Sequence, residues 1–154
     1  MFLSNIIDQS HVLSCSNVTS KKRLFQEISF KLEEMYSLNK DYVLGALQER
    51  EKLGPTGMGQ GVAIPHAKIE GIHNIRGLFI KLDKPIDFES IDKQPVDLIF
   101  AIIAPKNDGV DHLKALAKVS RVLRDPEIRT KLRSTEDISA LYSIITQDLN
   151  VKAA

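Results

Sequence analysis

Apolar residues along the first third of the chain recur at helical spacing. A short apolar run at residues 11–14 predicts a first strand. From Thr19 onward, apolar side chains fall three or four positions apart, at Leu24, Phe25, Ile28, Leu32 and Met35. Residues 40–53 predict a second helix, with Asn39 as a suitable N-cap and Gly54-Pro55 as its stop.

Strand patterns dominate the middle of the chain and helical spacing returns after it. Apolar runs predict strands at residues 62–64, 74–82 and 96–104, with a short piece at 86–88. The run at 96–104 is almost entirely apolar, as expected of a central strand covered on both faces.

Three helices are predicted after the last strand. The first covers residues 111–124, and the second opens on Pro126. Ser134 with Asp137 resembles a capping box for the third, which extends to about residue 146. The whole pattern predicts a single α/β domain with three layers, in which helices cover both faces of a mixed central sheet.

Composition narrows the class of protein. The 154 residues carry 21 Lys and Arg against 20 Asp and Glu, a net charge of +1, with 43% hydrophobic residues. This balance is typical of one soluble domain and argues against a large basic surface for nucleic acid. The single cysteine, Cys15, indicates a reducing compartment. No apolar run approaches the roughly 20 residues that cross a bilayer, and the N-terminus lacks a secretion pattern, so we expect a cytoplasmic protein without membrane insertion.

The glycine-rich segment at residues 54–61 excludes several enzyme classes. Gly57-x-Gly59-x-Gly61 follows a predicted helix and precedes a strand, the reverse of the dinucleotide-binding order. No nucleotide P-loop, nucleophile elbow or HExxH zinc motif is present. The four histidines lack ligand spacing, so we expect neither a metal nor a cofactor.

His66 is the strongest candidate for chemistry. It is predicted to follow a strand, beside a loop whose glycines can turn backbone N–H groups toward an anion. Pro65 restricts the backbone before it, and imidazole is a good nucleophile near neutral pH. A phosphoryl group on His66 would therefore find donors in the loop. The alternative is a hydrogen-bonded structural histidine next to an ordinary turn.

Residues 50–68, REKLGPTGMGQGVAIPHAK, resemble the active-site segment of type-2 enzyme IIA domains, the fructose/mannitol family of the bacterial sugar phosphotransferase system. Residues 91–100 and 111–116 are also similar to that family, and the likeness covers residues 4–148. The segment at 18–22 and the lack of appended transport domains look most like the nitrogen-regulatory branch.

The resemblance implies a phosphocarrier. His66 would accept a phosphoryl group on Nε2 from a phosphohistidine of an HPr-like carrier, while a backbone acceptor holds the other ring nitrogen. Arg50 and His112 would flank His66, with Arg50 complementing the phosphoryl oxygens. The adjoining loop would bring in Thr56, Gly57, Gly59 and Gly61. Ala67 departs from the glycine of many members.

Alternatives stay open at this stage. The protein would regulate partners through its phosphorylation state, or it would pass the phosphoryl group to a separate IIB protein during sugar uptake. Outside these two functions, it would be a non-enzymatic binding module, and a hydrolase is the weakest candidate. Without the resemblance, Arg50 is a solvated residue of a charged run and His112 a surface histidine at a helix start.

Overall fold

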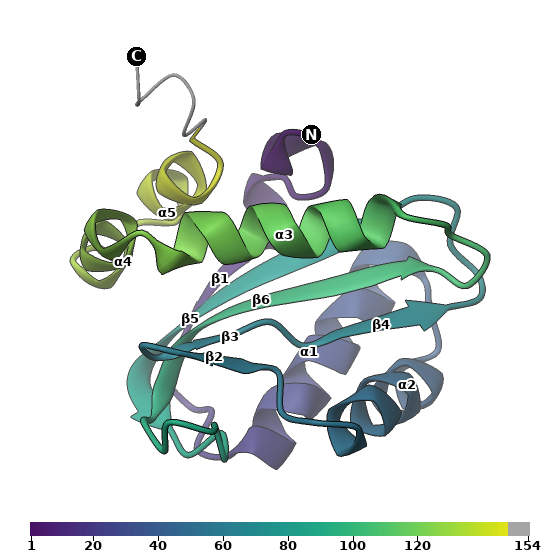
Figure 1. Cartoon of the computed structure of the whole chain (residues 1–154), viewed down its shortest axis with the longest axis horizontal. Helices are drawn as coiled ribbons and strands as arrows, with labels where there is room; N and C mark the ends of the chain where they lie inside the picture. Colours follow the sequence, from purple (N-terminus) through teal and green to yellow (C-terminus); the bar gives the residue numbers. More distant parts are fainter. Residues whose placement is uncertain (148–154) are drawn as a thin grey trace.

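The computed structural model describes residues 1–147, so the predicted domain limit at residue 148 lies just outside them. A mixed β-sheet lies between two layers of helices (Figure 1), which confirms the predicted α/β architecture. The strands are β1 (Val12–Cys15), β2 (Gly57–Gly59), β3 (Val62–Ala63), β4 (His66–Ile69), β5 (Arg76–Ile86) and β6 (Val96–Pro105). The helices are α1 (Lys21–Tyr36), α2 (Lys40–Lys52), α3 (Asp111–Arg124), α4 (Pro126–Arg133) and α5 (Ile138–Ile145), with 3-10 turns at Leu3–Asn5 and Gln9–His11.

β6 is the axis of the sheet, whose strand order is β1-β5-β6-β3-β2, with β4 also paired to β6. β5 runs antiparallel to β6, whereas β3 and β4 run parallel to it. Ala63 pairs with Ile99 and His66 with Ile102, an advance of three residues on both sides. β3 and β4 are therefore two halves of one strand, interrupted at Ile64 and Pro65.

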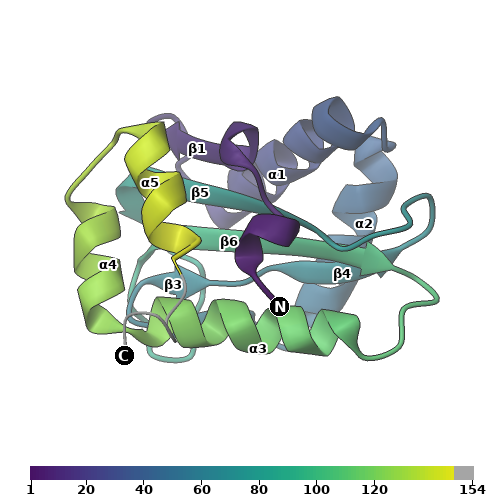
Figure 2. The same cartoon turned by 90° about the horizontal axis from the view of Figure 1, so that it is seen from above.

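Both faces of β6 are buried, as its apolar run predicts. Phe100 and its alternate neighbours pack with α3 and α5, whereas Ile99 and its alternate neighbours pack with α1 and α2. Figure 2 shows the two helical layers on opposite sides of the sheet. Within residues 1–147, no helix has both the length and the apolar character needed to span a bilayer.

Most predicted elements form where the pattern put them, with four differences, of which the unpredicted strand β4 is described below with His66. The cap of α5 is Asp137, whose carboxylate accepts from the Ala140 N–H, while Ser134 ends α4 instead; the predicted start at Ser134 is therefore wrong. The short piece at 86–88 contributes Ile86 to a long β5 through an irregular register. The glycine-rich segment holds a strand, β2, which pairs with β3 as a hairpin.

Candidate functional site

His66 is held by the interruption between β3 and β4. Contrary to the sequence prediction, it begins β4 instead of following the end of β3. Its Nδ1 lies 2.8 Å from the carbonyl oxygen of Ile64. A carbonyl only accepts hydrogen bonds, so Nδ1 carries the proton and Nε2 keeps its lone pair. Pro65 contributes rigidity at this point because its ring fixes φ.

The environment of His66 favours the neutral imidazole. Burial is the main cause that lowers the pKa of His66 below its usual value. The bond to Ile64 opposes this change, and the positive charge of Arg50 adds to it. A neutral ring with a free lone pair on Nε2 is the form that can act as a nucleophile.

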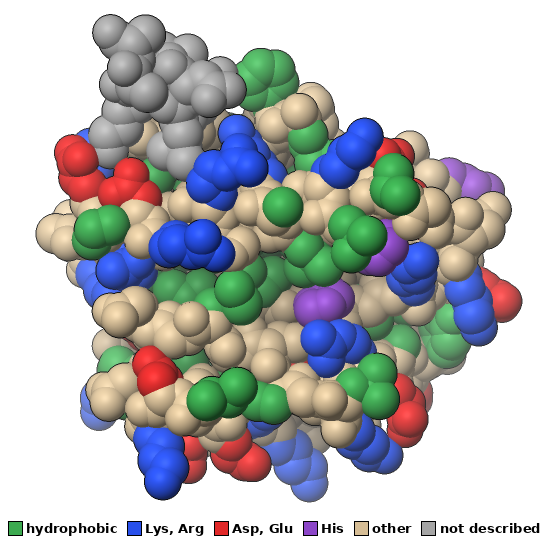
Figure 3. Space-filling model, viewed as in Figure 1, with side chains coloured by type: hydrophobic (Ala, Val, Ile, Leu, Met, Phe, Trp, Pro, Cys, Tyr) green, Lys and Arg blue, Asp and Glu red, His purple; other side chains and the backbone are tan. Residues whose placement is uncertain are grey.

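His66, Arg50 and His112 line one pocket of about 500 Å³. α2 contributes Arg50, β4 contributes His66 and α3 contributes His112, so three segments that are distant in sequence meet here. The rim also includes Leu53 and Leu113, whose side chains are largely exposed. In Figure 3 the hollow below α3 contains histidine side chains with basic and apolar side chains around them.

Arg50 lies in the last turn of α2 and is held at one point. Its Nη1 donates to the carbonyl oxygen of Gly54 at 3.0 Å. A guanidinium carries five N–H groups, and within residues 1–147 no other hydrogen bond occupies them. Arg50 therefore reaches the pocket with N–H groups that can still donate hydrogen bonds to an anion.

His112 is the second residue of α3. Asp108 Oδ2 accepts from its backbone N–H at 2.9 Å and lies 3.1 Å from its Nδ1. The positive end of the helix dipole at this position favours an anion nearby, an effect of about 0.3–1 kcal/mol in typical cases. His112 thus forms the wall of the pocket at the start of α3.

Thr56 is buried outside the pocket that holds His66. Its N–H and its hydroxyl donate to the two carboxylate oxygens of Glu51, at 2.9 and 2.7 Å. The ammonium of Lys21 lies 3.0 Å from the same carboxylate. Glu51 was not predicted from the sequence, because no periodicity or motif spacing marks an acid five residues before the threonine it binds. This network holds the segment after α2 in place, so the role of Thr56 is structural and indirect.

The three glycines do not line the His66 pocket, which corrects the expectation of an amide cradle made by this segment. Gly57 packs so closely against Ser90 and Phe88 that a Cβ there would clash with Ser90. Gly59, in the same strand, approaches Asp92, and Gly61 is covered by Arg133. These glycines allow close packing around the β2–β3 hairpin.

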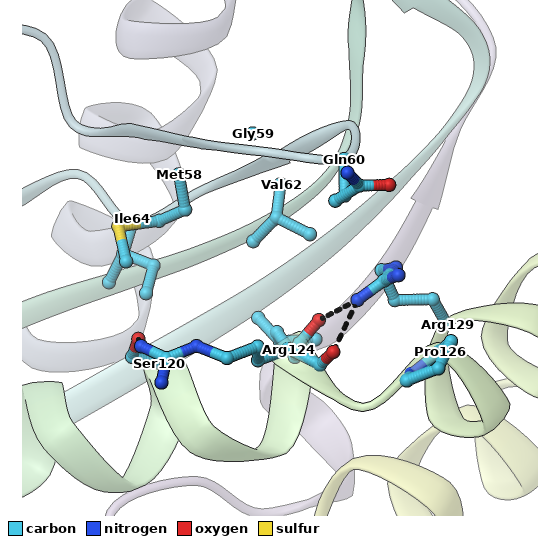
Figure 4. A pocket seen from close by; sticks show the side chains of 10 residues that line it. Met58, Gly59, Gln60, Val62, Ile64, Ser120, Arg124, Pro126 and Arg129 are labelled. Carbon is cyan, nitrogen blue, oxygen red and sulfur yellow. Dashed lines mark hydrogen bonds between the residues drawn. The ribbon is translucent and has the colours of Figure 1, made fainter. Parts of the chain in front are cut away.

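A second hollow of about 410 Å³ lies farther along α3, against the β2–β3 hairpin (Figure 4). Val62 and Ile64 line the hollow, and so do the arginines Arg124 and Arg129. Arg129 donates to the backbone oxygens of Leu123 and Arg124, at 3.1 and 2.6 Å. This guanidinium therefore caps the end of α3 from within the hollow.

The chain matches one family model and is similar to several known proteins. The family described as "Phosphoenolpyruvate-dependent sugar phosphotransferase system, EIIA 2" matches residues 5–148. A Bradyrhizobium diazoefficiens protein named nitrogen regulatory protein is 47% identical over 145 residues, covering 94% of this chain and 95% of that protein. The crystal structure of nitrogen regulatory protein IIA-Ntr from Neisseria meningitidis matches with TM-score 0.88 and 38% identity, covering 94% of this chain and 99% of that one. IIA mannitol from Escherichia coli, at 20% identity and TM-score 0.75 over 90% of this chain and 98% of that one, shares the fold.

Proposed function

This chain belongs to the EIIA type-2 family of the phosphoenolpyruvate-dependent sugar phosphotransferase system, and from that premise we propose that Nε2 of His66 accepts a phosphoryl group from a phosphohistidine of an HPr-like carrier. The observation that carries the proposal is the 2.8 Å contact between Nδ1 of His66 and the Ile64 carbonyl, inside a pocket shared with Arg50 and His112. This contact leaves Nε2 as the nucleophilic nitrogen. The 47% identity to a nitrogen regulatory protein supports a regulatory phosphocarrier role.

The transfer balances without any net movement of protons. The lone pair on Nε2 of His66 forms a bond to phosphorus as the bond between phosphorus and the donor's ring nitrogen breaks. The electron pair of the broken bond stays on the donor imidazole, and Nδ1 of His66 keeps its proton against Ile64. Because the chemistry is largely positioning and charge stabilisation, a ring that is already fixed contributes most of what the acceptor must supply.

Arg50 and His112 have supporting roles in this proposal. The guanidinium of Arg50 donates to the phosphoryl oxygens, whose negative charge it also offsets. His112 lies on the other wall of the pocket at the start of α3, where the helix dipole favours the same anion. The burial that lowers the pKa of His66 keeps its ring neutral and ready to attack.

Regulation follows from the charge of the product. A phosphoryl group adds about −1.5 to −2 charges at neutral pH, on a chain whose net charge is +1. The change occurs beside Leu53 and Leu113, which are exposed apolar side chains suited to contact with another protein. A downstream partner that docks over the pocket therefore distinguishes the two states by repulsion and desolvation.

Phosphorylation of matched histidine variants tests the proposal. The purified protein is incubated with phosphoenolpyruvate, the first enzyme of the relay and its carrier, and incorporated phosphate is quantified. We expect one acid-labile phosphoryl group on the native chain, none on His66→Ala, and full incorporation on His73→Ala, because His73 is exposed and outside the pocket. Undiminished labelling of His66→Ala would contradict the assignment of the acceptor.

A second candidate is a IIA component of sugar uptake, favoured by the family's established membership in a sugar phosphotransferase system. In that function the group on His66 moves on to a separate IIB protein. Mixing the phosphorylated chain with IIB proteins from the same cell distinguishes the two functions. Rapid loss of the label to a IIB protein supports sugar uptake, whereas retention of the label together with state-dependent binding of other proteins supports regulation.

A further inference from the structure

Asp108 is the only carboxylate that contacts the ring of His112 within residues 1–147, and the proposed function gives it no role so far. We propose that Asp108 is a positioning residue, which holds the His112 ring by Nδ1 so that Nε2 faces the phosphoryl-accepting pocket. This inference rests on the proposed function for its consequence, although the arrangement itself can be measured without any phosphoryl transfer.

The geometry of Asp108 fixes which ring nitrogen is free. One carboxylate oxygen lies 3.1 Å from Nδ1 of His112 and 2.9 Å from the backbone N–H of the same residue. The bond from that N–H is the main cause that lowers the pKa of Asp108, so the group is a carboxylate at neutral pH. A carboxylate only accepts hydrogen bonds, and therefore Nδ1 carries the proton that it donates.

The position of Asp108 is itself held in place. The ammonium of Lys68 donates to the backbone oxygen of Asp108 at 3.1 Å. Lys68 lies in β4, two residues after His66, and lines the same pocket. The loop that leads into α3 is thus fastened to the strand that carries the acceptor histidine. The side chains of Asp108 and His112 are only 12% and 19% exposed, so water has limited access to compete for this contact.

The two imidazoles then follow the same rule. The carbonyl oxygen of Ile64 accepts a hydrogen bond from Nδ1 of His66, and the carboxylate of Asp108 accepts one from Nδ1 of His112. In each case Nε2 is left for the pocket. Asp108 differs from Ile64 in carrying a full negative charge, so the hydrogen bond that it accepts from Nδ1 of His112 is charge-assisted. A His112 ring without Asp108 is free to rotate or change tautomer.

The test combines substitutions at Asp108 with ring nitrogen spectroscopy. In the native chain, ¹⁵N–¹H correlation of the His112 ring is expected to show the Nδ1–H form. Asp108→Ala is expected to abolish that signature and to slow phosphoryl acceptance about tenfold, the lower end of the range for carboxylates that orient a functional histidine. Asp108→Asn retains an amide oxygen that can accept both bonds, and it is expected to restore acceptance to within about threefold of the native rate.

Two comparisons separate positioning from general damage. Asp111→Ala removes an exposed acid at the start of the same helix and is expected to leave both readouts unchanged. In a His112→Gln background, Asp108→Ala is expected to add no further loss, because Asp108 acts through the ring. An Nε2–H form of His112 in the native chain, or a full additional loss in that background, overturns the inference. If no variant or native chain accepts a phosphoryl group, the proposed function fails, and the ring spectra still decide the role of Asp108.

Discussion

The His66 pocket and the turn between β2 and β3 each have an arginine, and the two arginines use their donors differently. In the His66 pocket, Arg50 donates a single hydrogen bond to the Gly54 carbonyl. At the β2–β3 turn, Arg133 donates from Nε and Nη2 to Asp97 at 2.9–3.2 Å, and from Nη2 to the Gln60 carbonyl at 2.7 Å. Arg133 thus uses both Nε and Nη2 to bind its own chain, whereas within residues 1–147 Arg50 uses only Nη1 in this way and has its other N–H groups for a ligand.

The surroundings of each arginine agree with that difference. Lys81 is a buried cation near Arg133, and its ammonium donates to the backbone oxygens of Arg133 and Thr135. This contact closes the end of α4 onto β5. The His66 pocket instead has exposed leucines at its rim and a volume of about 500 Å³. Charge alone therefore does not mark a functional site; what marks it is hydrogen-bonding capacity that the fold leaves unused.

The largest effect is expected from Arg50→Ala. Loss of the guanidinium should slow phosphoryl acceptance by about 10²-fold, the order seen when a single donor to a developing anion is removed. Stability should change little, since Arg50 makes one hydrogen bond to its own chain. Stopped-time labelling and thermal denaturation measure the two quantities. An unchanged acceptance rate would place Arg50 with the structural arginines.

Arg133→Ala is expected to produce the opposite pattern. Removing a two-point contact to Asp97 and a bond to Gln60 should lower the free energy of unfolding by about 1–2 kcal/mol, since charged hydrogen bonds of this kind contribute on that scale. Phosphoryl acceptance of the folded protein should stay within about twofold of native. Urea unfolding gives the stability, and labelling well below the transition gives the rate. A large loss of the acceptance rate without a loss of stability would contradict the distinction between Arg50 and Arg133.

The smallest effect concerns the protonation of His66. Burial lowers its pKa from the ordinary value of 6.5, so the neutral ring persists below that pH in the folded chain. The unfolded chain binds this proton more readily, and the contribution of His66 to stability is therefore full above pH 6.5 and declines as the pH falls toward the folded pKa. An NMR titration of His66 in the unphosphorylated protein should give a midpoint below 6.5. A midpoint at or above this value would mean that burial does not dominate.

Much of the fold could be predicted because local patterns and global packing agree. The apolar run of β6 and the periodic helices α3 and α4 lie where their residues indicated. β2 and the interrupted strand β3–β4 were harder to predict from the sequence, because glycines and a proline are typical of a loop when the partner strand is unknown. The same composition that suggests a flexible turn can pair as a hairpin once β6 supplies a neighbour.

Some residues of the candidate site could be anticipated before the structure was known and others could not. The grouping of Arg50 and His112 with His66 was anticipated only through the family resemblance, since no spacing rule links residues 50, 66 and 112. Glu51 and Asp108 were not anticipated, because each acts through contacts that depend on how a loop leaves or enters a helix. The glycines were assigned to the pocket from composition, which does not reveal the direction in which a backbone N–H points.

The interruption between β3 and β4, at Ile64 and Pro65, affects how phosphorylation could be detected by other proteins. The ring of His66 is held on its Nδ1 side by the backbone between β3 and β4, and in the proposed function the phosphoryl group would be attached to the opposite nitrogen, Nε2. We therefore expect the two states to share one fold and to differ in the surface potential around His66. Partner proteins would then distinguish the two states by the reversible change of charge at His66, without any change in the fold.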